Sequence, residues 1–242
     1  MRFDLDKIHK YCGVENRVEE NNFIWSGIMS ADGEIRMSLG YDLDLEVKAK
    51  PVYDVVSRLF DILSSFFSLA IALPIALIAA IAIRVEDGGP VFYSQSRLGK
   101  DGKVFTIYKM RSMKVNAEAN GAQWAVAEDE RITKVGRFIR KTRIDEIPQL
   151  YNILLGHMKI IGPRPERPEF AEEFCADLPE FANRVAVGPG LTGLAQVSGG
   201  YDLTPAEKLA LDLEYIENRG LWLDLKILLK TIWVVFSGNG AR

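Results

Sequence analysis

Residues 62–83 read ILSSFFSLAIALPIALIAAIAI, a run of 22 residues without a charged side chain. As a straight helix this run would extend about 33 Å, enough to cross the hydrocarbon core of a bilayer. Lys48, Lys50 and Arg58 precede it and Arg84 follows it, so cations stand at both ends. The composition predicts a membrane-embedded helix, and hydropathy alone favours a simple transmembrane span.

Pro74 lies at the centre of this apolar run. A proline inside a helix removes a backbone hydrogen bond, and its ring clashes with the preceding turn. A bend at Pro74 could return the chain to the side of the membrane from which it entered. A kinked helix that spans the membrane satisfies the same physics, so the residues alone leave both alternatives open.

Residues 22–49, upstream of the apolar run, have the pattern of a small β-module. Asp32-Gly33 is a turn signal between two runs with strand character. A period of two after this turn places the apolar side chains on one face of a strand. These side chains are Ile35, Met37, Leu39, Tyr41, Leu43, Leu45 and Val47. We expect a structural or dimerising accessory, which leaves a homodimer open.

Residues 88–113 predict two short strands around a turn, and the segment that follows predicts a basic helix. Its cations recur at helical spacing, at Arg131, Lys134, Arg137, Arg140 and Lys141. Such a run is either a solvated helix face or a surface that contacts anionic lipid headgroups or phosphates. Residues 162–168, GPRPERP, should be extended because prolines exclude a helix there.

Two more helices are predicted near the C-terminal end. The sequence TPAE at residues 204–207 supplies a capping threonine, a proline at the first helical position and a glutamate three residues after the cap. We expect this helix to end near Gly220. A last helix over residues 222–236 carries Lys226 and Lys230 among apolar residues. Core packing is its default environment, and the membrane interface is the alternative.

An adjacent acid pair, Asp145-Glu146, is the main chemical feature of the chain. Pro148 is tolerated only in the first turn of a helix, and Gly156 is typical just after a helix end, so we expect a helix over residues 146–155. Asp145 would then cap this helix and, facing its positive end, stay ionised. An acidic cap is also ordinary helix punctuation, so the pair alone does not establish catalysis.

Arginines accompany this acid pair. Arg140 and Arg143 flank it, Arg111 lies in the segment KMRSM, and Arg164 lies in the segment GPRP. Guanidinium groups match phosphate oxygens with paired hydrogen bonds. Two neighbouring carboxylates could hold Mg²⁺ together with substrate phosphates, and an ionised aspartate could attack phosphorus to form an acyl phosphate. The residues therefore suggest phosphate chemistry at a membrane surface.

From about residue 52 onward the chain resembles the bacterial sugar transferases, the monotopic phosphoglycosyl transferases. The resemblance covers most of the chain, and the order of its segments is far more specific than any one of them. The segments are the apolar helix with its central proline, SQSRLG, FTIYKMRSM, the RxxxxDExPQLxNxLxG run at 140–156, IGPRP, GPGLTGLAQVSG at 188–199 and LDLKILLKTI near the end.

This resemblance implies transfer of a sugar-1-phosphate from a UDP-sugar to polyprenyl phosphate, usually undecaprenyl phosphate. UMP is released, and the reaction is the first membrane step of glycoconjugate or exopolysaccharide assembly. Mg²⁺ is the implied cofactor, held at Asp145 and Glu146. Asp145 is the implied nucleophile that forms a covalent phosphosugar intermediate. Glu146 would assist through the metal or by proton transfer.

The resemblance also assigns binding residues and a place in the cell. Pro163-Arg164-Pro165 would belong to the nucleotide-sugar site, and Arg140 would bind phosphate. The apolar helix of the family re-enters on the cytoplasmic face of the bacterial inner membrane, among its lipids, which favours re-entry at Pro74. The family often has serine before this proline, where the present chain has leucine.

We therefore expect an α+β, mainly helical, monotopic membrane protein. A re-entrant, Pro-broken helix over about residues 59–84 and amphipathic interfacial helices would anchor it, and a small β element would complete it. Residues 51–242 would form the phosphoglycosyl transferase domain. Residues 1–50 would form the short accessory β-module, for which the resemblance offers no account.

Two other functions compete with this expectation. The acids of Asp42-Leu43-Asp44 have the DxD spacing of metal-dependent glycosyltransferases, which release UDP. Strand alternation, however, places both acids on an outer face. A membrane-tethered scaffold that binds anionic lipid is the non-catalytic alternative, but it needs neither the acid pair nor the Pro-Arg-Pro loop. The net charge of -3 does not favour nucleic acid as a partner.

Overall fold

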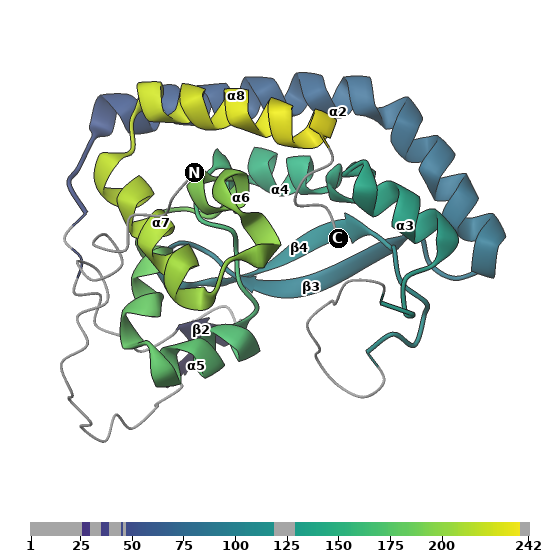
Figure 1. Ribbon diagram of the computed structural model, residues 1–242, viewed down its shortest axis with the longest axis horizontal. Helices are drawn as coiled ribbons and strands as arrows, with labels where there is room; N and C mark the ends of the chain where they lie inside the picture. The colour runs from purple at the N-terminus through teal and green to yellow at the C-terminus, as the bar shows by residue number, and fades with distance from the viewer. Residues whose placement is uncertain (1–25, 30–34, 39–44, 46, 119–128, 238–242) are drawn as a thin grey trace.

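The computed structural model describes residues 26–29, 35–38, 45, 47–118 and 129–237. The turn at Asp32-Gly33 and the acids of Asp42-Leu43-Asp44 lie outside these residues, as do His9 and Cys12. The described part is mainly helical, with small two-stranded sheets and one long apolar helix (Figure 1).

The elements are distributed along the whole described chain. The α-helices are α2 (Pro51–Asp87), α3 (Lys134–Lys141), α4 (Gln149–Leu155), α5 (Pro168–Asp177), α6 (Leu194–Ser198), α7 (Pro205–Asn218) and α8 (Leu221–Ser237). Short 3-10 helices are η1 (Lys100–Gly102), η2 (Ile144–Glu146), η3 (Pro179–Ala186) and η4 (Gly200–Asp202). The strands are β1 (Ser26–Met29), β2 (Ile35–Ser38), β3 (Phe92–Leu98), β4 (Val104–Met110), β5 (Lys159–Ile161) and β6 (Gly190–Thr192).

The strands pair in three small sheets within the described residues. β3 and β4 form the antiparallel hairpin that the sequence predicts, and Phe92 pairs with Met110 at its open end. β1 and β2 pair antiparallel within the predicted N-terminal module. β5 and β6 are parallel, with Ile161 opposite Thr192, and they bring two distant loops together.

Several predicted helices are confirmed. α7 begins with a complete capping box between Thr204 and Glu207 and ends at Asn218. α8 matches the predicted last helix within a residue at each end. α3 is the basic helix, but Arg131 lies before it and pairs with Asp129 at 2.6 Å. Residues 162–167 lie outside the helices and strands, and α5 begins at the last proline of GPRPERP.

Helix α2 continues through Pro74 and bends (Figure 1). Pro74 has no N–H to donate to the carbonyl four residues earlier, which weakens one side of the helix and permits the bend. The first half of α2 packs on α4, and Ala79 and Ile83 in the second half pack on Ile139 of α3. It is long and apolar enough to cross a membrane, and only 11% of its most apolar 18-residue stretch is buried inside the protein.

A buried polar stripe fixes α2 to the rest of the protein. Its members are spaced by four residues, at Tyr53, Ser57, Asp61 and Ser65. Asp61 Oδ1 accepts a hydrogen bond from the backbone N of Ile160 at 2.9 Å, and Tyr53 donates to Asp224 at 2.8 Å. Arg58 donates to the carbonyls of Ile153 and Leu154 at the C-terminal end of α4, where carbonyls lack the usual intrahelical donors.

The main apolar core lies between β5, α5, η3, α7 and α8. Its most deeply buried members include Leu209, Ile216 and Ile227. Leu45 and Val47 pack against this core, so the segment that precedes α2 adheres to the body of the protein. Arg219 donates to the carbonyl of Lys48 at 2.9 Å and strengthens this attachment.

Gly136 sets the distance between α3 and the segment after β4. A Cβ atom at this glycine would lie 1.9 Å from the carbonyl oxygen of Ser112, far inside contact distance. We predict that Gly136→Ala destabilises the protein by about 1–3 kcal/mol, the usual cost of overpacking. Urea unfolding in detergent micelles, followed by tryptophan fluorescence, measures the effect.

Gly220 provides the matched control for this prediction. The only neighbour that its added Cβ would meet among the described atoms is the carbonyl oxygen of Asn218, at 3.9 Å. Gly220→Ala should therefore leave the urea midpoint close to that of the wild type. Equal midpoints for the two variants would contradict the close approach of α3.

Candidate active site

The acid pair lies in the 3-10 turn η2, between α3 and α4. Arg143, which precedes this turn, has a left-handed backbone with φ 60°, and this conformation ends the path of α3. The prediction of a helix over residues 146–155 capped by Asp145 is wrong at its start. Pro148 stands at the N-cap, and α4 begins only at Gln149. The acid pair belongs instead to η2, the separate turn before α4, in which Ile147 N donates to the carbonyl of Ile144 at 3.2 Å.

The end of α4 agrees with the sequence. Gly156 adopts the left-handed conformation with φ 87° just after the last helical residue. Within the described chain this helix makes no side-chain cap with Asp145, so the carboxylate is available for another role.

Asp145 is buried, with 8% of its surface exposed, and it faces a large cavity. Its carboxylate makes no hydrogen bond or ion pair with the described residues. Burial, assisted by the charge of Glu146, raises the pKa of Asp145 to about 6, against the opposing effect of Lys109, Arg140 and Arg164. The carboxylate is therefore largely ionised at neutral pH, yet more basic than an ordinary aspartate.

Glu146 has the opposite environment. Its Oε1 accepts a hydrogen bond from Arg164 Nη2 at 2.6 Å and lies 3.4 Å from Lys109 Nζ, while its Oε2 lies 3.9 Å from Arg143 Nη1. Burial alone would raise the pKa of Glu146, but these cations hold it well below its usual range. The two neighbouring acids therefore differ: one is paired and firmly ionised, and the other faces open space.

A cavity of about 560 Å³ lies in front of this pair. Strands β3 and β4, turn η2, the loop after β5, helix α6 and helix α8 all contribute to its wall. The wall is cationic beside the acid pair, where Lys109, Arg140, Arg143 and Arg164 gather. These charges suit a ligand with several phosphate oxygens.

The loop of residues 163–166, PRPE, is held by its carbonyl groups. Pro163 and Pro165 lack an N–H, so this loop has few backbone donors, and its carbonyl oxygens provide much of its attachment. Each of the four consecutive carbonyls accepts one hydrogen bond. The donors are, in order, Gly190 N at 2.8 Å, Arg184 Nη2 at 3.1 Å, Arg97 Nη1 at 3.1 Å and Leu98 N at 2.9 Å. Four separate contacts thus fix the position from which Arg164 reaches Glu146.

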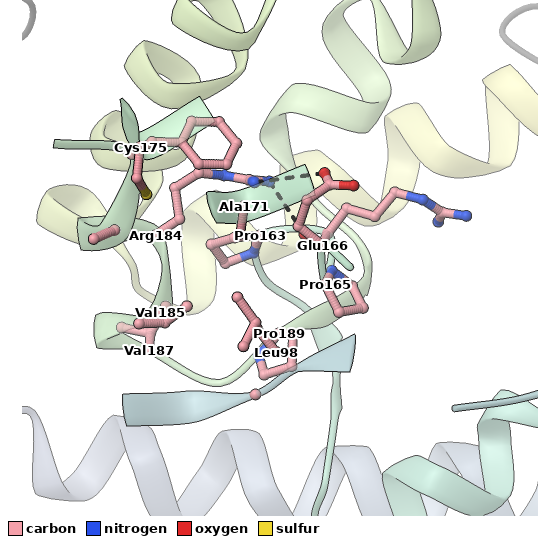
Figure 2. A pocket seen from close by; sticks show the side chains of 14 residues that line it. Leu98, Pro163, Pro165, Glu166, Ala171, Cys175, Arg184, Val185, Val187 and Pro189 are labelled. Atoms are coloured by element: carbon pink, nitrogen blue, oxygen red, sulfur yellow. Dashed lines mark hydrogen bonds and ion pairs between the residues drawn. The ribbon is translucent and has the colours of Figure 1, made fainter. Parts of the chain in front are cut away.

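Arg184 is itself anchored from behind. Its Nε donates to the fully buried Asp212 of α7 at 2.6 Å, and its guanidinium lies over the ring of Phe181. Figure 2 shows Arg184 and Glu166 pointing toward each other beside Pro163 and Pro165. The proline loop is therefore braced by a buried ion pair that belongs to the core.

The structure places most of the predicted site residues around this cavity. Asp145, Glu146, Arg140, Arg143, Arg164 and Pro165 all line it. Pro163 instead lines a smaller space on the other side of the loop (Figure 2). Pro74 lies in α2, outside the group of residues that line the cavity.

Arg111 also lines the cavity, but its guanidinium is engaged elsewhere. It forms two hydrogen bonds of 2.5 Å with the carboxylate of Asp87 and donates to the carbonyl of Pro90. Arg111 therefore ties the end of α2 to the start of the β3–β4 hairpin.

Sequence reasoning missed Lys109, Arg97 and Arg184. The signal for Lys109 was strand alternation, since it shares a face of β4 with the buried Ile107. A lysine on the inward face of a strand needs an anionic partner, and here that partner is Glu146. No comparable pattern marked Arg97 or Arg184, whose contacts with the proline loop are to backbone carbonyls distant in sequence.

Comparisons with known proteins point to one family. A family model described as bacterial sugar transferase matches residues 52–238. A UDP-N-acetylgalactosamine-undecaprenyl-phosphate N-acetylgalactosaminephosphotransferase of Aeromonas hydrophila is 44% identical over 195 residues, which are 79% of this chain and 46% of the relative. A UDP-glucose:undecaprenyl-phosphate glucose-1-phosphate transferase of Caulobacter vibrioides is 39% identical over 193 residues, which are 78% of this chain and 72% of the relative.

A third relative is close to this chain in extent. The exopolysaccharide production protein PSS of Rhizobium leguminosarum bv. phaseoli is 38% identical over 190 residues, which are 74% of this chain and 94% of the relative. By contrast, the chain spans about half the length of the Aeromonas protein. With a family model that matches most of its residues, the chain belongs to the bacterial sugar transferase family.

Proposed function

We propose that this protein transfers a sugar-1-phosphate from a UDP-sugar to polyprenyl phosphate, undecaprenyl phosphate in the bacterial cell, and releases UMP. This would be the first membrane step of glycoconjugate or exopolysaccharide assembly. The observation that carries the proposal is the unpaired, buried carboxylate of Asp145 in a cavity lined by cations. The names of the Aeromonas and Caulobacter relatives describe transferases of the same class and support it.

In the first step Asp145 attacks the donor phosphorus that carries the sugar. An O–P bond forms to the carboxylate, the bond from this phosphorus to the UMP oxygen breaks, and UMP leaves with the electron pair. A carboxylate without a hydrogen-bond partner keeps its lone pairs available, and its raised pKa makes it a better nucleophile. Arg140, Arg164 and Lys109 stabilise the negative charge that spreads over the phosphoryl oxygens.

In the second step an oxygen of polyprenyl phosphate attacks the same phosphorus. The bond to Asp145 breaks, the carboxylate is regenerated, and a polyprenyl diphosphate sugar leaves. Two sequential steps allow one cavity to serve a water-soluble donor and a membrane-bound acceptor in turn. Glu146, firmly ionised by its cations, positions Arg164 and Lys109 and is poorly suited to carry a proton.

Mg²⁺ fits this donor set as a substrate-linked cofactor. It commonly binds through one or two carboxylates together with substrate phosphates. Asp145 offers a carboxylate with no partner in the described chain, and Glu146 offers Oε2, which lies 3.9 Å from Arg143 Nη1. The residues described contain no group of three or more metal-binding side chains, so donor phosphates would complete the coordination. When bound, the ion would neutralise diphosphate charge.

We further propose a monotopic protein on the cytoplasmic face of the inner membrane, with α2 re-entrant. Exposed apolar side chains cover α2 from Val52 to Val85, and more cover α8. The bend in α2 and the cations near both of its ends, Arg58 and Arg84, support return to the same face. Residues 51–242 would be the transferase domain and residues 1–50 the accessory module.

Asp145→Asn should reduce UMP release by on the order of 10³-fold or more, because it removes the nucleophile. The carboxylate makes no hydrogen bond that the amide would lose, so folding and membrane association should stay intact. Coupled assays of nucleoside monophosphate, with mass spectrometry of protein incubated with UDP-sugar, measure the loss. Glu169→Gln, at an exposed position of α5, is the control. A sugar-phosphate adduct on the Asn variant, or UDP as the product, would contradict this function.

Arg164→Ala should raise the apparent KM for UDP-sugar about 10- to 100-fold, because it removes a charge-assisted contact from the cavity and takes from Glu146 its shortest ion pair. Initial-rate kinetics at fixed acceptor concentration test this expectation. Arg137→Ala removes an exposed arginine of α3 that does not line the cavity, and it should leave this KM unchanged. An unaltered KM in the Arg164 variant would remove this loop from donor binding.

Re-entry predicts that both ends of α2 face the same compartment. The test uses a variant that lacks the native Cys12 and Cys175. A single cysteine is introduced into it at Val52 or at Val85, which are exposed positions near the two ends of α2. A membrane-impermeant maleimide should label both in inside-out vesicles and neither in right-side-out vesicles. Labelling of the two positions from opposite sides would establish a spanning helix instead.

A further inference from the structure

Helix α8 presents apolar side chains in two directions. Its outward residues are exposed, at Leu221, Trp222, Leu225, Leu229, Ile232 and Trp233. Its inward residues line the cavity of the active site, at Leu228, Thr231, Val234 and Val235. Val235 belongs to the cavity wall and is also 45% exposed, so it marks the rim where the cavity meets the outer surface of α8.

The apolar wall of the cavity continues from α8 to the acid pair. Ile147 follows Glu146 directly in the chain, and Leu150 lies one turn further along. Ile160 of β5 and Leu191 of β6 line the same cavity. One wall therefore begins beside the reacting carboxylate and ends at the membrane-facing helix.

A cavity with one cationic side and one apolar side favours a ligand that has both a charged and an apolar part. The cationic side of the cavity suits a phosphate group, and the apolar side suits a hydrocarbon chain. A UDP-sugar is polar over most of its surface, so it has little apolar area that could contact a long apolar wall. A phosphate monoester with an apolar chain matches both sides.

We propose that the inner face of α8, together with Ile147, Leu150, Ile160 and Leu191, binds the first isoprene units of the polyprenyl phosphate acceptor. The phosphate lies against the cations beside Asp145, and the rest of the tail leaves past Val235 onto the outer face of α8. This inference rests on the proposed function and adds the location of the acceptor to it.

Size and energetics agree with partial entry of the tail. A cavity of about 560 Å³ lies within the range of about 300–1,000 Å³ typical of small-molecule sites, so it holds a headgroup and the start of a chain. Lipid hydrocarbon is as apolar as the wall, so transfer of the tail gains little free energy. The wall acts by avoiding a penalty, because hydrocarbon placed against a polar surface would lose its apolar surroundings.

Photocrosslinking distinguishes the rim from the outer face. p-Benzoylphenylalanine is introduced at Val235 or, as the control, at Leu229, in full-length protein in nanodiscs that contain radiolabelled polyprenyl phosphate. The Val235 variant should capture the labelled acceptor, and a tenfold excess of unlabelled acceptor should suppress that capture. The Leu229 variant should show only weak labelling. Because contact with bulk lipid is not saturable, the excess of unlabelled acceptor should not suppress this labelling. Equal labelling at both positions, or no competition at Val235, would overturn the assignment.

Kinetics provide the second test. Val235→Asn should raise the KM for polyprenyl phosphate about three- to tenfold, whereas Leu229→Asn should change it by less than about twofold. UMP released from donor alone serves as the internal reference for the first step. If wild-type protein released no UMP from donor, the proposed function would fail. If it did, and the two Asn variants had the same acceptor KM, only the tail site would fail.

Discussion

The contact between Arg164 and Glu146, at 2.6 Å, joins the two halves of the site. Glu146 belongs to the turn after α3, and Arg164 belongs to the proline loop after β5. The surrounding contacts maintain this distance. Four carbonyl contacts hold the proline loop, and one of their donors, Arg184, is paired with the buried Asp212. Because Glu146 pairs with these cations, its neighbour Asp145 faces the cavity without an ion pair of its own among the described residues, as the proposed nucleophile requires.

Much of this arrangement could be read from the sequence, and the exceptions have physical causes. The capping box of α7, the β3–β4 hairpin and the glycine after α4 depend on local chemistry and were predictable. The start of α4 was not, because the left-handed backbone of Arg143 turns the chain before Pro148 can begin a helix. The engagement of Arg111 with Asp87 was hidden because 24 residues separate the partners.

The long helix α2 has an exposed apolar surface and a buried polar stripe, and its composition alone does not reveal the second. Most of its apolar side chains are exposed, while every fourth residue near its start is polar and buried. These polar contacts, such as Asp61 with the backbone of Ile160, attach α2 to the strand that leads into the proline loop. The long apolar helix and the proline loop are thus held in one frame, which in the proposed function would fix the height of the site relative to the lipid.

The backbone of Arg143 gives this turn a thermodynamic character of its own. A left-handed conformation costs a residue with a Cβ roughly 1–2 kcal/mol, and glycine would adopt it freely. The chain carries an arginine there instead, with its guanidinium directed to Glu146. At this position the backbone conformation costs folding free energy, and the side chain that it carries adds a cation beside Glu146.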